Sequence, residues 1–188
     1  MSIVRFISDL HFGHEWMAKH RGFLNAEEQD EHIIKMWNKV VNKKDLVYIL
    51  GDVTMENAKL HAHKLGKLNG TKILVGGNHD MKGEMNEILK YIHGAVGMVD
   101  YKGYTLTHCP IHPTEVNFYR GNIHGHIHEK YITKSDGIDD WIDSKYINVC
   151  CECINYTPIT LDEVIDLQNK LKDKPKLNYE KESLAMAG

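Results

Sequence analysis

The sequence predicts an α/β protein, and two features of its hydrophobic pattern support this fold class. Short β-rich runs each stop at a cluster of polar residues, and helical patterns lie between the early runs. Strands that alternate with helices in this way favour a layered α/β architecture. The expected strands cover residues 3–7, 46–50, 72–75, 104–106, 122–123 and 146–153.

Four helices are expected between and after these strands. The first begins at Asn25, because asparagine is a good helix cap and Glu28 stands three residues later, as in a capping box. A second helix covers about residues 55–68, and a short third one covers 84–92. The last helix covers about residues 160–171 and opens with a second capping box.

The length of 188 residues allows one domain, which we place at residues 1–172, followed by a polar tail at 173–188. The stretch 129–145 is irregular, and a loop of this length is more often functional or mobile than structural. A formal net charge of -3 argues against the broad basic face of a duplex-binding protein. A small nucleotide or a short single strand remains open as a partner.

The sequence also predicts a cytoplasmic protein that does not associate with membranes. No window approaches 18 consecutive apolar residues, and Asp9 interrupts the first apolar run. The cysteines, Cys109, Cys150, Cys151 and Cys153, are not spaced as a disulfide framework, so we expect reduced thiols. On a strand, Cys150 points away from the other two members of its cluster, which favours buried apolar packing over a zinc site.

Residues that bind metal ions follow most of the expected strands. They are Asp9 and His11, Gly51-Asp52, Gly77-Asn78-His79-Asp80, His108, and Gly125-His126-Ile127-His128. On a strand, the spacing of Asp9 and His11 puts both side chains on one face, so they can converge on one ion. Asp30 and His32 have the same spacing inside the expected first helix, where the side chains diverge, and we discard that pair.

Taken in order, these motifs resemble the signature of the calcineurin-like metallophosphoesterases, over about residues 8–128. The segment 8–14 and the pair Trp37-Asn38 are similar to a compact bacterial and phage branch of that family. The resemblance implies a four-layer α/β/β/α sandwich with metal ions at the carboxyl ends of the strands.

The resemblance further implies two divalent metal ions. It assigns Asp9, His11 and His128 to one ion, Asn78, His108 and His126 to the other, and the carboxylate of Asp52 to both. This mixture of nitrogen and oxygen donors suits Mn²⁺ first, and also Fe²⁺, Zn²⁺, Ni²⁺ or Co²⁺, better than Ca²⁺. His124 remains an alternative to His126.

The activity that the resemblance implies is hydrolysis of a phosphodiester by a hydroxide that bridges the two metals. His79 would protonate the leaving group, and Asp80 would orient His79. A phosphomonoesterase acting on a nucleotide or a phosphoprotein is the alternative on the same metal core. A scaffold without catalytic activity is the third hypothesis, which the complete set of ligand positions disfavours.

Three further side chains are candidates for binding the substrate phosphate, namely His14, Arg21 and Arg120. His14 is the first choice, because it is close in sequence to His11. Phe118 and Tyr119 could stack on a nucleobase, but packing at the core or rim is favoured.

Overall fold

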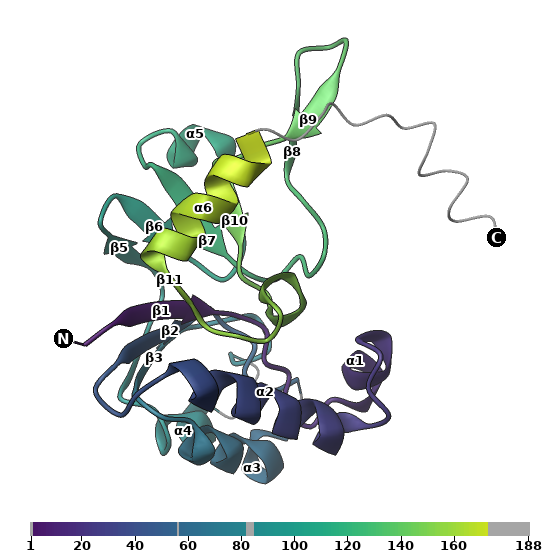
Figure 1. Ribbon diagram of the computed structural model, residues 1–188, viewed down its shortest axis with the longest axis vertical. Coiled ribbons are helices and arrows are strands. Elements are labelled where there is room, and N and C mark those ends of the chain that lie inside the picture. Colours follow the sequence, from purple (N-terminus) through teal and green to yellow (C-terminus); the bar gives the residue numbers. More distant parts are fainter. Residues whose placement is uncertain (1, 56, 82–84, 173–188) are drawn as a thin grey trace.

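A computed structural model describes residues 2–55, 57–81 and 85–172. The predicted tail, 173–188, lies outside these residues. Two mixed β-sheets form the centre of the molecule, and helices pack around them (Figure 1). The α/β class that the sequence predicts is therefore confirmed.

The first sheet has the order β11-β1-β2-β3-β4. Its strands are β1 (Val4–Ile7), β2 (Leu46–Ile49), β3 (Thr71–Val75), β4 (Gly94–Val96) and β11 (Ile159–Thr160). Strands β1 to β4 pair in parallel, whereas β11 pairs antiparallel with β1. Because β1, β2 and β3 are parallel neighbours, the loops that follow them leave the sheet at the same edge.

The second sheet has the order β10-β7-β6-β5. Its strands are β5 (Val99–Tyr101), β6 (Tyr104–Leu106), β7 (Gly121–His124) and β10 (Tyr146–Asn148). β6, β7 and β10 are parallel, so the loops after β6 and β7 also share an edge. The stretch 129–145 contains a separate antiparallel pair, β8 (Thr133–Ser135) and β9 (Asp140–Ile142), where the sequence predicts an irregular loop.

The two sheets meet through the chain that follows β1 and β10. The amide of Ser8 donates to the carbonyl of Val149 at 2.9 Å, and the amide of Cys151 donates to the carbonyl of Ser8 at 3.1 Å. This parallel bridge between Ser8 and Cys150 brings the loop after β1 close to the second sheet. Polar residues from both sheets are thereby placed side by side.

The helices include two elements that the sequence did not predict, α1 and α5. The α-helices are α1 (Glu15–His20), α2 (Ala26–Val40), α3 (Ala58–His61), α4 (Met85–Leu89), α5 (Pro113–Val116) and α6 (Leu161–Lys172), and two 3₁₀ helices are η1 (Ala62–Lys67) and η2 (Cys151–Ile154). α1 has six residues and α5 has four, too few for a helical period to show. The expected helix 55–68 begins only after Asn57, whose φ of 57° is left-handed and does not fit a right-handed helix.

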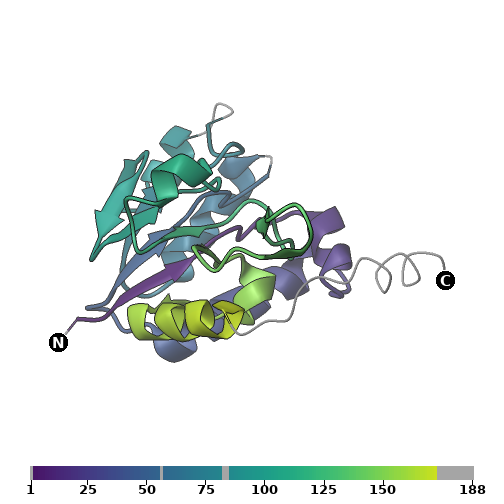
Figure 2. The same cartoon turned by 90° about the horizontal axis from the view of Figure 1, so that it is seen from above.

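Helices α2, α3 and α4 lie on one side of the first sheet, as Figures 1 and 2 show. α6 contacts β1 and β11 of the first sheet as well as β10 of the second. The four-layer sandwich stays a prediction, because α6 packs against strands of both sheets and does not form a layer on one of them. Among the described residues, no helix combines the length and the apolar composition needed to cross a membrane.

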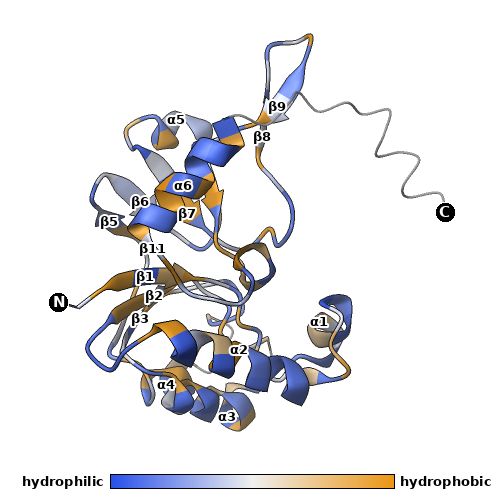
Figure 3. Ribbon diagram, viewed as in Figure 1, coloured by the Kyte–Doolittle hydropathy of each residue, from blue (hydrophilic) through white to orange (hydrophobic). Residues whose placement is uncertain are grey.

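Apolar residues of the central strands and of α2 form the core. The ribbon of β1 is mostly coloured hydrophobic (Figure 3). Phe6, Ile49 and Leu74 from three adjacent strands are fully buried, as is Trp37 of α2. The indole nitrogen of Trp37 donates to the carbonyl of Asn69 at 3.0 Å, so this large side chain is buried with its polar atom satisfied. The core thus fixes β1 to β3, whose ends carry the polar loops.

Candidate metal centre

The polar residues predicted from the sequence lie directly after strands of both sheets. Asp9 and His11 follow β1, Asp52 follows β2, and Asn78 and His79 follow β3. His108 follows β6, while His126 and His128 follow β7. The shared edges of the parallel strands and the bridge at Ser8 bring these seven loop positions and His79 to one region.

Five of the seven predicted metal ligands have a left-handed backbone. The φ angles are 58° at Asp9, 48° at His11, 53° at Asp52, 72° at His126 and 52° at His128. A positive φ is uncommon outside glycine, and each such residue costs on the order of 1 kcal/mol or more. Strain of this kind persists where the surrounding structure holds it, and it concentrates at functional sites.

The backbone conformation also corrects the reasoning about Asp9 and His11. β1 ends at Ile7, so these two residues do not lie on the strand. Their side chains converge because both residues turn through the left-handed region, and not because strand alternation places them on one face. The two side chains lie close together, but strand alternation is not the reason.

Asp9, His11 and His128 form one group of candidate ligands, with donor atoms within 4.8 Å of one another. Asp9 and His11 are 0% and 1% exposed. Oδ1 of Asp9 and both ring nitrogens of His11 are buried without a hydrogen-bond partner, although Nε2 of His11 lies 3.5 Å from that oxygen. Buried polar atoms without partners are costly, and a bound cation would satisfy them.

A second group surrounds Nε2 of His108. This nitrogen lies 2.9 Å from Oδ1 of Asn78, 3.2 Å from Nδ1 of His126 and 3.3 Å from Oδ2 of Asp52. Its other ring nitrogen, Nδ1, contacts the carbonyl of Leu50 at 2.7 Å. A backbone partner on Nδ1 is the usual arrangement that directs Nε2 of a histidine toward a metal.

Asp52 lies between the two groups. Donor atoms of Asp9, Asp52 and His108 are also within 4.8 Å of one another, so Asp52 can reach an ion in either place. Its Oδ1 accepts the backbone amide of His79 at 3.0 Å. The side chains present could therefore hold divalent cations, and Asp52 lies within reach of both groups.

The charges within the site stabilise one another. Burial raises the pKa of Asp9, but the close approach and the charge of the His11 ring outweigh it and hold the pKa of this carboxyl well below its ordinary range. Burial lowers the pKa of His108, yet the hydrogen bond and the charge of Asp52 raise it to about 9. The carboxylates are thus ionised and ready to bind cations near neutral pH.

His79 and Asp80, the predicted catalytic pair, make different contacts. The ring of His79 lies 5.9 Å from that of His11, and its Nε2 is 3.9 Å from Oδ2 of Asp52. Asp80 is buried, and its carboxylate accepts the backbone amides of Asp52, Val53 and Gly77 at 2.8 to 2.9 Å. Both oxygens of Asp80 accept backbone amides, whereas the prediction had this residue orient His79. Through these hydrogen bonds Asp80 connects the loop after β2 to the loop after β3.

The three predicted substrate-binding residues also differ in position. The ring of His14 lies 5.9 Å from that of His11, beside the site. Arg21 has a side chain only 1% exposed, and its guanidinium donates to Glu152 at 2.6 Å and to the carbonyl of Asp9 at 2.8 Å. Arg120 precedes β7 and lies over the ring of Tyr104 at the amino ends of the strands. Of the three, His14 lies beside the candidate ligands. Arg21 hydrogen-bonds to the backbone of the ligand Asp9, and Arg120 lies at the opposite ends of the strands.

The alternatives left open by the sequence are also placed. His124 is buried, with Nδ1 at 2.9 Å from the carbonyl of Gly125, and burial lowers its pKa to about 4. The structure groups His126, and not His124, with His108. Phe118 is 82% exposed, so it does not pack in the core.

The cysteine cluster does not lie on a strand as expected. β10 ends at Asn148, and 3₁₀ helix η2 covers Cys151 and Cys153. Cys151 is a buried free thiol, as predicted. Cys150 is also buried, but its thiol donates to Oδ2 of Asp9 at 3.1 Å, so it does not pack as an apolar group, and Cys153 is exposed, unlike the prediction.

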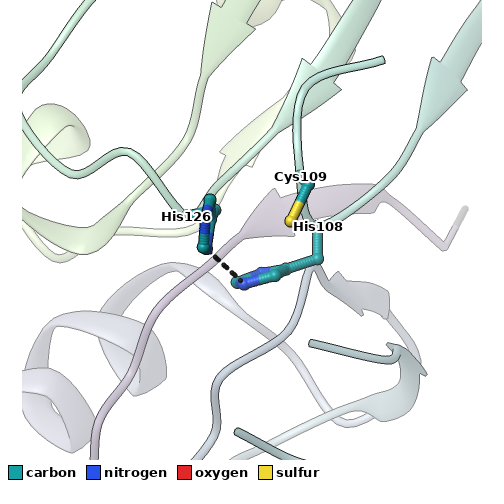
Figure 4. Close-up of side chains that lie close together, drawn as sticks. All are labelled: His108, Cys109 and His126. Atoms are coloured by element: carbon teal, nitrogen blue, oxygen red, sulfur yellow. Dashed lines mark hydrogen bonds between the residues drawn. The ribbon is translucent and has the colours of Figure 1, made fainter. Parts of the chain in front are cut away.

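Three residues near the candidate ligands were not predicted from the sequence as part of the site, namely Cys150, Glu152 and Cys109. Oε1 of Glu152 lies 2.6 Å from Nδ1 of His128, and this contact orients the histidine ring. The thiol of Cys109 lies within 4.8 Å of donor atoms of both His108 and His126 (Figure 4). No local sequence pattern predicts a role for Glu152. Cys109 could have been predicted, because it directly follows the candidate ligand His108.

The fold and the site together define an α/β protein with two adjoining groups of histidine and carboxylate ligands. No family model matches the chain. The uncharacterized protein MJ1445 of Methanocaldococcus jannaschii is 37% identical over 178 residues, which cover 92% of this chain and 94% of that protein. The Gene 66 protein of Mycobacterium phage L5 is 30% identical, over 93% of this chain and 98% of the phage protein. This chain belongs to the same family as these two proteins.

One solved structure agrees with the fold. The protein of unknown function AQ665 from Aquifex aeolicus superposes with a TM-score of 0.67 at 27% identity, over 89% of this chain and 100% of that one. Pseudomonas putida nuclease MPE gives a TM-score of 0.45 at 18% identity, over 66% of this chain and 60% of the nuclease, which is too low to bear on function.

Proposed function

We propose that this protein is a calcineurin-like phosphohydrolase that uses two divalent metal ions to hydrolyse a phosphodiester. The observation that carries the proposal is the convergence of seven metal-ligating side chains from five strand ends of two sheets. The buried polar atoms of Asp9 and His11 that have no hydrogen-bond partner support cation binding independently of any resemblance.

Asp9, His11 and His128 would hold one ion, Asn78, His108 and His126 the other, and Asp52 both. Two such ions activate a water molecule for attack and polarise the phosphoryl oxygens. The nitrogen and oxygen donors favour Mn²⁺, with Fe²⁺, Zn²⁺, Ni²⁺ and Co²⁺ as alternatives. Four free cysteine thiols support a reducing, cytoplasmic location.

His79 is the residue we assign to protonation of the leaving oxygen. Its side chain is 17% exposed, so a substrate can reach it, and it adjoins His11 and Asp52 without belonging to either ligand group. The amide of His79 donates to Oδ1 of Asp52, which ties the position of this residue to the site. A positioned acid contributes about 10²- to 10⁴-fold to the rate.

The test combines metal analysis with hydrolysis of bis-p-nitrophenyl phosphate and p-nitrophenyl phosphate, with Mn²⁺ or with chelator. We expect about two metal ions per chain and diester hydrolysis that chelator abolishes. His79→Ala should retain the metals and lose at least about 100-fold in kcat. His63→Ala removes an exposed histidine of η1 and serves as the matched control, with unchanged activity.

Three outcomes would change the conclusion. If the protein prefers the monoester by tenfold or more, the assigned activity becomes that of a phosphomonoesterase and not a phosphodiesterase. Full activity of His79→Ala would remove the proposed acid. Protein that binds two metal ions but hydrolyses neither ester would favour the scaffold hypothesis.

A further inference from the structure

A cavity of about 420 Å³ opens beside the candidate ligands. Helix α1 forms one wall and the segment after β7 forms the other, with Trp16, Met17, His20, His126, His128 and Lys130 among the lining residues. Two of these residues, His126 and His128, are proposed metal ligands. Any group that occupies the cavity therefore adjoins a phosphate bound at the metal site.

Trp16 is exposed over 63% of its surface, which is unusual for so large an apolar side chain. Its ring stacks on that of His20, with centroids 5.1 Å apart and planes inclined by 6°. His20 is held in turn by Glu129, whose Oε1 lies 3.1 Å from Nε2 of His20. The stack and the ion pair fix the indole while most of its surface stays exposed.

The indole is connected to the metal site by a series of rings. The ring of His14 lies 5.9 Å from that of His11 and 6.3 Å from that of Trp16. The ring of His14 thus lies between Trp16 and His11, one of the proposed metal ligands. Among the exposed large apolar side chains that the structure describes, Trp16 alone lines this cavity.

We propose that this cavity binds the nucleoside of a nucleotidyl phosphodiester, with its base stacked on Trp16. The proposal rests on the proposed phosphohydrolase function and specifies its substrate class. A flat aromatic surface stacks on any nucleobase, and the cavity volume is in the range that holds small organic ligands.

Two substrates with the same leaving group test this proposal. Thymidine 5′-(4-nitrophenyl phosphate) and methyl 4-nitrophenyl phosphate are both diesters of 4-nitrophenol and differ in the nucleoside. We expect the wild type to prefer the thymidine diester in kcat/KM, and Trp16→Ala to reduce this preference by at least about fivefold. Trp16→Phe keeps a flat ring and should retain most of the preference, whereas Trp16→Leu should lose it.

Trp141→Ala is the matched control, because Trp141 lies on β9 and does not line the cavity. Equal hydrolysis of both diesters by the wild type, or a preference that Trp16→Ala leaves intact, would overturn the subsite and leave the phosphohydrolase in place. If neither diester is hydrolysed, the proposed function fails for these substrates. Calorimetric titration of the metal-loaded protein with thymidine 5′-monophosphate then decides the subsite, which is overturned if Trp16→Ala binds as tightly as the wild type.

Discussion

At the scale of single residues, the site depends on close approaches and buried contacts. Ser8 donates from Oγ to Oδ2 of Asp9 at 2.5 Å, and the amide of His126 donates to the same oxygen at 2.9 Å. These donors fix one oxygen of Asp9 and leave Oδ1 facing His11. The orientation of the carboxylate, and with it the geometry available to a metal, is set before any ion binds.

Gly125→Ala should disrupt this arrangement. A Cβ at position 125 would lie 1.9 Å from Oγ of Ser8 and 2.3 Å from Oδ2 of Asp9, and both of these residues are fully buried. We expect at least a tenfold loss of metal affinity and about 1–3 kcal/mol lower stability, measured by metal titration and urea unfolding. Gly97→Ala is the control, since a Cβ there has nothing within 4 Å. Unchanged metal affinity of Gly125→Ala would contradict the placement of Asp9.

Glu152→Gln should weaken metal binding without unfolding the protein. Burial raises the pKa of Glu152, but the hydrogen bond from His128 and the charge of Arg21 lower it below the ordinary value, so the residue is ionised. Glutamine keeps the shape and removes the charge that orients His128. We expect a loss of about 10- to 100-fold in metal affinity by calorimetry. The exposed Glu31→Gln provides the control, and an equal effect of both variants would rule out a specific role for Glu152.

At the scale of secondary-structure elements, α2 supports the loop that follows β1. Asn25 caps α2 as predicted, because its Oδ1 accepts the amide of Glu28 at 2.9 Å. From the same helix, Oδ2 of Asp30 accepts the amide of Gly13 at 2.9 Å, and Nε2 of Gln29 donates to the carbonyl of His11 at 3.3 Å. Asp30, which the sequence argument discarded as a ligand, therefore fixes the ligand-bearing loop through its backbone.

The turn between α2 and β2 predicts a pH dependence of stability. Amides of Asn42 and Ile3 donate to the carboxylate of Asp45 at 2.8 and 2.9 Å, and they lower its pKa below the ordinary value. A lowered folded-state pKa means that the stabilisation is present above the unfolded pKa and is lost as pH falls through the folded one. In urea unfolding below about pH 5, we expect Asp45→Asn to lose less stability with falling pH than the wild type.

The control for this turn is Asp166→Asn, because Asp166 is an exposed residue of α6. This variant should follow the wild-type pH profile. If Asp45→Asn follows that profile as well, the anchor between the start of β1 and the turn before β2 does not contribute to acid stability.

At the scale of the whole molecule, the candidate ligands connect the two sheets. Asp9, Asp52 and Asn78 follow strands of the first sheet, whereas His108 and His126 follow strands of the second. A metal held by both sets is a cross-link between halves of the fold. Binding to the folded state alone raises the free energy of unfolding.

Metal loading should therefore raise the thermal midpoint. At a free metal concentration of about 100 times Kd, the stabilisation is about 2.7 kcal/mol, which corresponds to roughly 5–10 °C for a chain of this size. Scanning calorimetry with Mn²⁺ and with chelator measures the shift, which Asp52→Asn should reduce and His63→Ala should preserve. A midpoint that is the same with metal and with chelator would mean that the ligands do not cross-link the sheets.

The sequence by itself determined the α/β class, most of the central strands and the residues able to bind metal at their ends. It could do so because strand pattern, helix caps and ligand type are properties of neighbouring residues. Only the tertiary structure decided that α1 forms, that Asp80 clamps backbone amides and that Arg21 pairs with Glu152, 131 positions away. The tertiary structure also decided that Trp16 lines a cavity with the candidate ligands His126 and His128. Contacts of this kind depend on the bridge between the two sheets at Ser8 and Cys150. These residues are far apart in the sequence, so no local pattern predicts that they pair.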